Sequence, residues 1–339
     1  MLKELSLKLL SNYLYNFLAV KFGRISSLKP LFFTFYTNLR CNFSCSYCGF
    51  ATSGQTKSYR DELDTKSVIR LLKIIKRETS AIYFTGGEPL LRNDIVDILK
   101  ATRKMGFKSI AVNTNMSLIH RKMEVLDYLT NLVASFDMIN KDEYSKILSV
   151  SSVVAHQVKQ NVITCANLQK EKKFLMTVNC VIIPQTISQV REVMNFCFKH
   201  GIKFAVVPAQ LGDGMINKEL KNNAKYQQLI RDIIVAKKKN KLVFGSFSFL
   251  NVLQGFKRFE CFPTLTPHIY PNGDLFYPCE PLQKVATNLL EVGDYQKALK
   301  IGISKFGNLP MCKDKCYKAC YVEPSMFVKN PLLAIRGWE

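Results

Sequence analysis

Six short apolar segments recur along the chain, and each is followed by a segment with helical spacing wherever the chain continues. The six are residues 31–39, 81–85, 109–114, 132–137, 174–182 and 204–209. The expected helices span residues 65–78, 93–105, 119–129, 187–200 and 218–238, with a longer helical stretch that ends near 164. Strands that alternate with helices form a parallel sheet with right-handed crossovers. The pattern therefore predicts an α/β fold with a partial (β/α)6 barrel of the TIM type.

The remaining sequence divides around this barrel, which we assign to residues 31–245. Residues 1–30 place apolar side chains at helical spacing among lysines, which predicts an amphipathic N-terminal helix. From about residue 258 the sequence changes to loops, prolines and cysteines, and residues 258–323 are expected to form a small C-terminal domain. Residues 324–339 form an apolar tail.

The composition describes a folded and strongly basic protein. Of the 339 residues, 47% are hydrophobic, and the formal net charge is +22. Such a charge can attract nucleic acid, anionic lipid or an acidic substrate. The lysines, however, are scattered over predicted helices and are not interleaved with aromatic residues as a base-stacking surface would be. The net charge is therefore compatible with a nucleic-acid partner, but the sequence does not favour one.

The cysteines and the N-terminus bear on the cellular location. No cleavable secretory signal is recognisable, and no apolar run reaches the ~18 residues of a membrane-spanning helix. Eleven unevenly spaced cysteines favour metal or redox chemistry in a reducing compartment. We therefore expect a cytoplasmic protein. The basic amphipathic N-terminus leaves peripheral membrane contact open, and a helix packed on the outside of the barrel is the alternative.

Three cysteines, Cys41, Cys45 and Cys48, lie directly after the first predicted strand. A structural zinc site commonly takes four protein ligands, but this CxxxCxxC segment offers three and has no histidine close by. Three thiolates can instead hold three corners of a 4Fe–4S cluster and leave the fourth iron open to an external ligand. The spacing favours such a cluster. A zinc site completed from elsewhere and a set of buried apolar cysteines are the alternatives.

A second motif, GGEP at residues 86–89, follows the second predicted strand. By itself it fits a strand-to-helix turn in which glycines allow close approach, Glu88 accepts hydrogen bonds and Pro89 fixes the turn. CxxxCxxC after the first strand and GGEP after the second resemble the signature of the radical S-adenosylmethionine (SAM) superfamily. The resemblance extends from about residue 31 to residue 323.

The resemblance implies a mechanism. The three cysteines would bind a 4Fe–4S cluster whose open iron is chelated by the amino and carboxylate groups of SAM. An electron from a reductant such as ferredoxin or flavodoxin would lead to cleavage of SAM into methionine and a 5′-deoxyadenosyl radical, and this radical would abstract hydrogen from the substrate. The cofactor carries that chemistry, while the protein orients it and excludes water.

The resemblance also implies which residues contact SAM. Tyr47 matches the aromatic position that contacts adenine, and Glu88 would accept from the SAM ammonium group. "VNTNM" (112–116) and "SFD" (135–137) resemble two further family segments. The SAM-site candidates are Tyr47, Gly86, Gly87, Glu88, Pro89, Thr114, Asn115, Ser135, Asp137 and Lys146.

Two features depart from the family pattern. Lys146 stands near the place of an arginine that clamps the SAM carboxylate, and lysine offers a point charge in place of a bidentate fork. Met116 and Met138 stand where the family has glycine, which predicts that the backbone at both positions avoids positive φ.

A second cysteine group follows in the C-terminal region. "PNGDLFYPC" (271–279) resembles the β-hairpin of SPASM and twitch extensions, with Asn272-Gly273 as the turn. The resemblance implies one auxiliary 4Fe–4S cluster, which takes four of five cysteines. The five are Cys261, Cys279, Cys312, Cys316 and Cys320. A zinc ribbon is the alternative.

Three functions remain open from the sequence. The first is a radical SAM enzyme that acts on a peptide, a sugar or a lipid-linked small molecule. The second is a radical SAM enzyme that modifies nucleic acid, and the third is a non-catalytic iron–sulfur electron-transfer or scaffold protein. The intact cysteine triplet and Glu88 favour an enzyme. The motifs leave the residues that act on the substrate unassigned.

Overall fold

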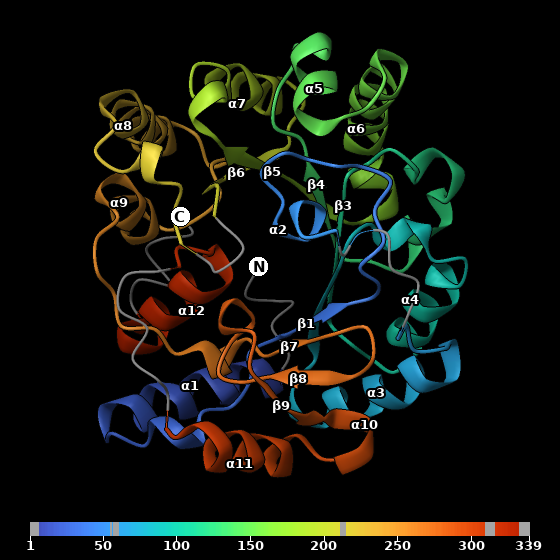
Figure 1. Ribbon diagram of the computed structural model, residues 1–339, viewed down its shortest axis with the longest axis vertical. Helices are drawn as coiled ribbons and strands as arrows, with labels where there is room; N and C mark the ends of the chain where they lie inside the picture. The colour runs from blue at the N-terminus through green and yellow to red at the C-terminus, as the bar shows by residue number, and fades with distance from the viewer. Residues whose placement is uncertain (1–6, 55, 57–60, 211–214, 309–315, 332–339) are drawn as a thin grey trace.

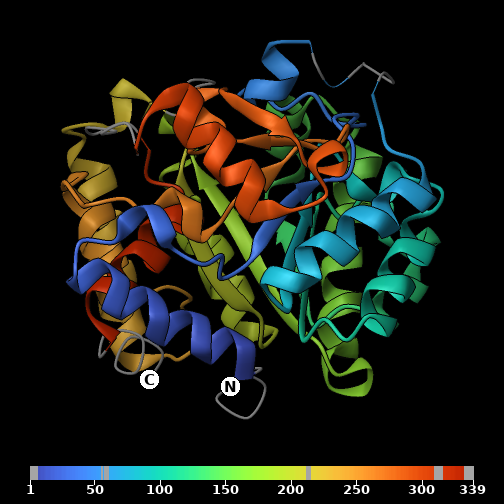
Figure 2. The same ribbon diagram turned by 90° about the horizontal axis from the view of Figure 1, so that it is seen from below.

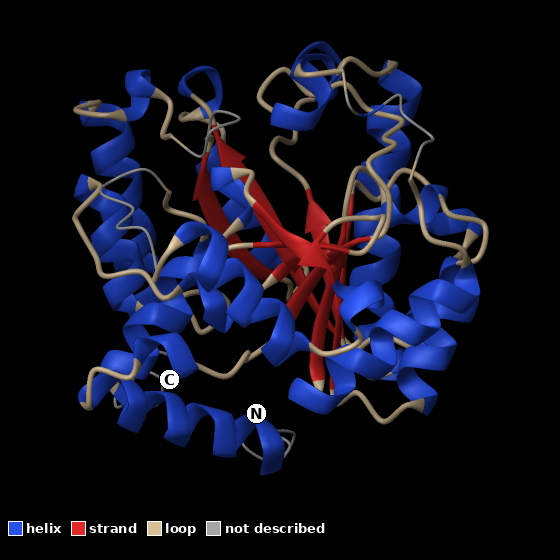
Figure 3. Ribbon diagram, turned by 60° about the horizontal axis from the view of Figure 1, so that its bottom comes forward, coloured by secondary structure: helices blue, strands red, loops and turns tan. Residues whose placement is uncertain are grey.

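The computed structural model describes residues 7–54, 56, 61–210, 215–308 and 316–331. Its centre is a sheet of parallel strands that follow an arc, with helices on the outside (Figures 1 and 3). The six strands predicted from the sequence all form. They are β1 (Phe33–Tyr36), β2 (Ala81–Thr85), β3 (Ser109–Thr114), β4 (Asn131–Ser135), β5 (Leu175–Ile182) and β6 (Lys203–Pro208).

Helices follow these strands much as the sequence predicts. Those around the barrel are α2 (Gly49–Thr52), α3 (Thr65–Glu78), α4 (Ile95–Lys104), α5 (Lys141–Leu148), α6 (Ser152–Lys172), α7 (Val190–Lys199), α8 (Ala224–Lys239) and α9 (Phe247–Gly255). In α3, for example, the Asp64 carboxylate accepts a 2.7 Å hydrogen bond from the Ser67 N–H and caps the helix. Its apolar residues at helical spacing, such as Val68, Leu72 and Ile75, are buried in the core.

One predicted helix is wrong. Residues 119–129, expected to be helical, contain two short 3-10 turns, Ile119–Arg121 and Met123–Asp127. The break falls at Lys122, whose backbone (φ −141°, ψ 39°) lies outside the helical region. The Lys122 ammonium group donates to the carbonyl oxygen of Arg92, which ties this connection to the loop that follows β2.

The C-terminal hairpin extends the same sheet. Strands β7 (His268–Ile269), β8 (Asp274–Phe276) and β9 (Val285–Asn288) add to the β1 edge, giving the order β6-β5-β4-β3-β2-β1-β7-β8-β9. β7 pairs with β1 in parallel and with β8 antiparallel. The predicted turn forms: Gly273 has φ +92°, and its N–H donates to the Tyr270 carbonyl at 2.9 Å.

Three helices form where the sequence analysis expected mainly loops. They are α10 (Leu289–Val292), α11 (Tyr295–Phe306) and α12 (Ala319–Lys329). In α12 a proline, Pro324, lies inside the helix, and cysteine and proline together hid its helical character in the sequence. The helix includes the start of the predicted apolar tail, whose residues 332–339 lie outside the described residues.

The N-terminal helix α1 (Leu7–Lys21) lies beside α12 (Figures 1 and 2). A small second core joins the two helices and contains Leu28, Leu265 and Val328. Of the helices that the structure describes, none has both the length and the apolar character needed to cross a bilayer.

Candidate functional site

The cysteine loop runs from the end of β1 to α2 and holds Cys41, Cys45 and Cys48, all partly buried free thiols. Phe43, which is buried, anchors the loop in the core. The Cys48 N–H donates to the Cys45 carbonyl at 3.0 Å. Burial raises the pKa of Cys41 to about 11 and also raises the pKa of Cys45, and the carboxylates of Glu88 and Asp137 raise the two values further. Cys41 and Cys45 are thus neutral thiols as they stand, and a bound cation would stabilise their thiolates.

The GGEP turn is fastened to the segment that leads into Cys41. The Gly87 N–H donates to the Asn38 carbonyl at 2.9 Å, and the Glu88 N–H donates to the Arg40 carbonyl at 2.7 Å. A Cβ atom on Gly86 would lie 2.2 Å from the Asn38 oxygen, and one on Gly87 would lie 2.0 Å from the Arg40 oxygen. Close approach to the chain's own backbone therefore requires glycine at both positions.

Glu88 is fully buried and joins the ends of β2 and β3. Its Oε1 accepts hydrogen bonds from the Leu90 N–H (2.9 Å) and the Thr114 hydroxyl (2.7 Å), and its Oε2 accepts one from the Asn115 N–H (2.7 Å). Burial raises the pKa of Glu88 to about 7, and the three hydrogen bonds oppose that rise. A carboxylate has about four acceptor positions. One position on Oε2 is left for a further donor.

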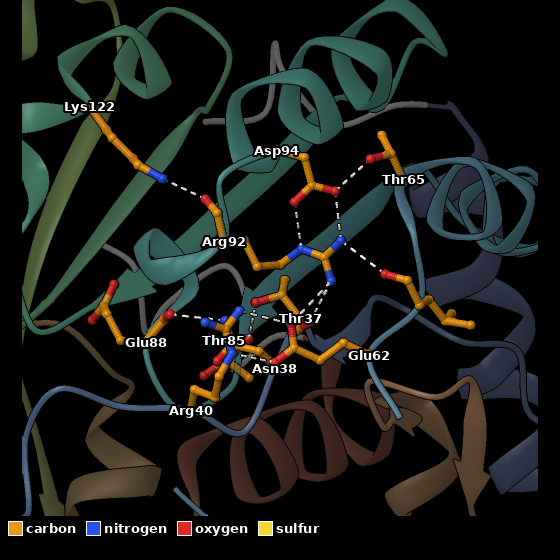
Figure 4. A network of polar contacts seen from close by, with 11 residues as sticks. Thr37, Asn38, Arg40, Glu62, Thr65, Thr85, Glu88, Arg92, Asp94 and Lys122 are labelled. Carbon is orange, nitrogen blue, oxygen red and sulfur yellow. Dashed lines mark hydrogen bonds and ion pairs between the residues drawn. The ribbon is translucent and has the colours of Figure 1, made fainter. Parts of the chain in front are cut away.

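Arg92 holds the GGEP turn from behind and was missed by the sequence analysis. Its guanidinium group bonds Asp94 at 2.9 and 2.7 Å and donates to the carbonyls of Thr37 and Leu63, each at 3.0 Å (Figure 4). Beside it, Arg40 forms a two-pronged ion pair with Glu62 at 2.6 and 2.9 Å. The sequence signal that could have identified Arg92 is a charged residue directly after the GGEPLL segment.

Asn115 links the third strand to the cysteine loop. Its side-chain Nδ2 donates to Asn42 Oδ1 at 2.9 Å and lies 3.8 Å from the sulfur of Cys41. The next residue, Met116, has φ +66°, so the prediction that it avoids positive φ is wrong. Its N–H donates to the Thr114 hydroxyl (3.1 Å), and its carbonyl accepts from the Asn161 side chain (2.7 Å), contacts that hold the left-handed conformation. Met138, the other departure, is not among the residues with positive φ.

Asp137 links the fourth strand to the same loop. The Tyr47 hydroxyl donates to its Oδ2, and the Val181 N–H donates to its Oδ1 at 2.7 Å. Burial raises the pKa of Asp137 to about 6. Ser135, two residues earlier, donates weakly to the Asn113 side chain at 3.4 Å. Tyr47, expected beside adenine, thus has its hydroxyl on a protein carboxylate.

Tyr144 of α5 is a second residue that the sequence analysis missed. Its ring is 1% exposed, and its hydroxyl has no hydrogen-bond partner among the described residues. Burial raises its pKa well above the usual value, and the negative charge of Asp137 raises it further. Lys146 is exposed two residues later, about 200° round the helix. None of the described hydrogen bonds and ion pairs joins Lys146 to Glu88 or Asp137.

These residues fit the chemistry of a radical SAM site. Three thiols, a carboxylate with spare acceptor capacity and a buried unpaired hydroxyl lie at the carboxyl ends of the strands. Among the described residues, no three His, Cys, Asp or Glu side chains are arranged to hold one metal ion. A 4Fe–4S cluster instead binds each thiolate through a different iron.

The C-terminal cysteines form a second group around Tyr321. The charges of Cys279, Cys316 and Cys320 contribute to raising the pKa of Tyr321, behind burial as the main cause. Glu280 beside them is 5% exposed and accepts from the Lys318 ammonium group at 2.6 Å. Cys261 is partly buried. Cys312 lies outside the described residues.

The sequence comparisons match about half of the chain or less. Residues 36–197 match the family model of the Radical SAM superfamily. The chain is 27% identical over 172 residues to the probable GTP 3′,8-cyclase of Methanothermobacter thermautotrophicus, covering 50% of this chain and 54% of that protein. It is 34% identical over 149 residues to molybdenum cofactor biosynthesis protein 1 of Dictyostelium discoideum, covering 42% of this chain and 23% of that protein. The chain thus matches about half of the first relative's length and less of the second.

Solved structures resemble the chain over a longer span. SuiB of Streptococcus suis bound to its precursor peptide SuiA superposes with a TM-score of 0.62 at 21% identity, covering 81% of this chain and 67% of that chain. Native anSMEcpe with bound AdoMet and the Cp18Cys peptide superposes with a TM-score of 0.59 at 17% identity, covering 90% and 98%. At these identities the likeness shows a shared fold.

Proposed function

The chain belongs to the radical SAM superfamily, and on that premise we propose that it cleaves SAM reductively and abstracts hydrogen from a peptide, a sugar or a lipid-linked small molecule. The observation that carries the proposal is the convergence of the cysteine triplet, Glu88 and Asp137 at the carboxyl ends of β1 to β4. When bound, a 4Fe–4S cluster on Cys41, Cys45 and Cys48 supplies the electron that splits SAM into methionine and a 5′-deoxyadenosyl radical.

The chain's own residues bind and orient. Glu88 has a free acceptor position for the SAM ammonium group, and its bonds to Thr114 and Asn115 fix the carboxylate in place. The Tyr144 hydroxyl can donate to a polar group of SAM, because it lacks a partner within the described chain. Asp137, held by Tyr47 and Val181, keeps the cysteine loop in contact with the ends of β4 and β5. Burial of these groups excludes water from the reacting atoms.

We also propose one auxiliary 4Fe–4S cluster on the C-terminal cysteines. The gathering of Cys279, Cys316 and Cys320 around Tyr321 supports it, and Cys261 or Cys312 would complete the set. Iron and sulfide analysis of the reconstituted chain distinguishes the alternatives: about eight irons fit two clusters, whereas about four irons with zinc fit a zinc ribbon.

The test of the activity is anaerobic. The chain is reconstituted with iron and sulfide, reduced with dithionite and mixed with SAM, and 5′-deoxyadenosine is measured. We expect product from the wild type and from Cys165→Ala, which removes a buried thiol outside the loop. We expect only background from Cys45→Ala. If the wild type makes no more product than that background, the enzyme function is ruled out, and the electron-transfer or scaffold function would replace it.

The substrate is identified by hydrogen transfer. Deuterated GTP and deuterated peptides encoded beside this chain's gene are offered in turn, because the relatives are named for GTP cyclisation and the SuiB structure holds a peptide. Deuterium recovered in 5′-deoxyadenosine marks the substrate. A ferredoxin or flavodoxin from the same cytoplasm is the expected reductant in place of dithionite.

Nucleic acid stays the second candidate because of the +22 net charge. Its test is a titration of tRNA at rising salt, since contacts with phosphate weaken steeply as salt increases. Binding that is lost at physiological ionic strength would remove this candidate.

A further inference from the structure

The N-terminal helix buries two asparagines and exposes a row of large apolar side chains. Asn12 and Asn16 are 4% and 0% exposed, whereas five large apolar residues at spacings of three and four are exposed. We call these five the apolar stripe: Leu7, Leu10, Leu14, Leu18 and Phe22, exposed by 88%, 55%, 62%, 43% and 69%. A helix packed on a barrel normally has the opposite arrangement.

Two buried asparagines, together with the small second core, hold α1 in place. Asn16 donates to the Lys29 carbonyl at 2.8 Å and accepts from the Lys29 N–H at 2.7 Å. Asn12 donates to the carbonyls of Pro30 (2.9 Å) and Glu78 (3.0 Å). These bonds attach α1 to the protein without use of the stripe. The stripe is therefore not needed for packing against the rest of the described chain.

The stripe is also concentrated. Nine large hydrophobic residues are exposed in the part of the chain that the structure describes, and five of them belong to the stripe. The other four are scattered over the rest of the molecule: Val153, Leu175, Val235 and Val285. A continuous exposed apolar patch of this kind marks an interaction surface.

Charge indicates the partner. Residues 7–29 contain four basic residues, Lys8, Lys21, Arg24 and Lys29, and no acidic residue. Lys21 and Arg24 are exposed beside the C-terminal end of the stripe. An apolar face bordered by basic residues complements the acyl chains and phosphates of an anionic bilayer surface.

A second copy of the chain fits less well. The 15 residues of α1 make a helix about 22 Å long and about 10 Å wide, so its outer face covers on the order of 220 Å². A stable protein interface buries about 800 Å² on each partner. A bilayer needs no such area, because each inserted leucine and each nearby lysine or arginine adds to binding separately.

We propose that the apolar stripe docks this protein on an anionic membrane surface, with α1 lying in the plane of the interface. The site then faces away from the bilayer. Asn12 contacts Glu78 just before β2, whereas Glu88 lies just after β2, and Figure 3 shows α1, beside the N label, at the end of the sheet away from the arrowheads. If the proposed function holds, its substrate reaches the barrel from the aqueous side.

The test is sedimentation of the full chain with lipid vesicles, which needs neither cluster nor SAM. Vesicles of phosphatidylcholine are compared with vesicles in which phosphatidylglycerol replaces part of it. We expect binding to the anionic vesicles, reduced by about tenfold or more in Leu14→Gln/Leu18→Gln. Lys21→Gln/Arg24→Gln should lose about tenfold on anionic vesicles. Glutamine favours helix and leaves α1 intact.

The matched control is Val153→Gln/Val235→Gln, which removes two exposed apolar residues from other helices. It should bind like the wild type. Equal binding by the wild type and Leu14→Gln/Leu18→Gln, or no vesicle binding at all, would overturn the proposal. So would a lipid-free dimer that this stripe variant abolishes, which would identify a second copy as the partner. Vesicle binding that appears only after truncation following Pro331 would assign the stripe to the chain's own tail.

Discussion

At the scale of single residues, Glu88 is the carboxylate on which the candidate site is organised. It is buried, and the three donors that are described as hydrogen-bonded to it are all neutral. The charged form is therefore costly to bury, which is why its pKa is raised from 4.5 to about 7. That cost is offset when a cation, such as an ammonium group, comes beside it.

The raised pKa predicts how the stability of the cofactor-free protein depends on pH. A carboxyl whose pKa is higher in the folded state stabilises the fold fully below its unfolded pKa, and this contribution is lost as pH rises through about 7. Between about pH 4.5 and about pH 7, the free energy of unfolding should fall by up to about 3 kcal/mol, and above that range it should level off. Urea denaturation of the wild type and of Glu88→Gln measures the difference.

The Glu88→Gln variant should lack most of this fall, although it starts less stable because glutamine accepts at one oxygen only. Asp137 titrates at about 6 in both proteins, so its contribution cancels in the comparison. Parallel pH curves for the two proteins would contradict the assignment.

Arg92 is expected to contribute more to stability than an exposed arginine. Its side chain is 5% exposed and bonds Asp94 and two carbonyls. Lysine cannot make these bonds from one ammonium group, so Arg92→Lys should cost about 2–4 kcal/mol. The control is Arg191→Lys, because the Arg191–Asp232 pair is more than a third exposed and should lose about 1 kcal/mol or less.

Thermal or urea unfolding compares the two arginine variants. We expect the larger loss at Arg92, because its bonds hold the GGEP turn in place. A similar loss at both positions would mean that the bonds around Arg92 add little to the fold.

The candidate site residues that could be predicted from the sequence are those that lie in short motifs. The residues whose role depends on tertiary contacts could not be predicted. Cys41, Cys45, Cys48 and Glu88 were located because their motifs are local. Tyr144 could not be, because its burial against Phe136 and the lack of a partner for its hydroxyl depend on how α5 packs. Lys146 was chosen by its place in a motif, but the side of α5 that faces the barrel is the one that carries Tyr144.

At the scale of elements, the six barrel strands could be predicted because each is a short apolar run bounded by a turn. The structure of residues 119–129 could not be predicted, because the helical pattern is interrupted at Lys122, whose side chain bonds to the loop after β2. The short strand β7 could not either, since a two-residue strand exists only through its pairing with β1.

The attachment of α1 by asparagines makes a prediction at this scale. Asn16→Ala removes both bonds to Lys29 and leaves a backbone N–H and a carbonyl unpaired, so it should cost about 1–3 kcal/mol. Ser11→Ala on the exposed side of the same helix should change stability by less than about 0.5 kcal/mol. Urea denaturation is the measurement. Equal effects would show that the asparagines do not anchor the helix.

At the scale of the whole molecule, the C-terminal hairpin and the barrel share one nine-stranded sheet. The sequence predicted the hairpin and its turn, but it did not predict that β7 would pair with β1, the strand that leads into the cysteine loop. The two cysteine groups are thus built on neighbouring strands. The central claim is that the first group alone presents an open iron to SAM.

Electron paramagnetic resonance of the reconstituted and reduced chain tests that claim most directly. The spectrum of Cys45→Ala, which keeps the C-terminal cysteines, is subtracted from that of the wild type. We predict that the difference contains a 4Fe–4S signal and that this signal changes when SAM is added. A difference spectrum without a cluster signal, or a signal that SAM leaves unchanged, would contradict the account.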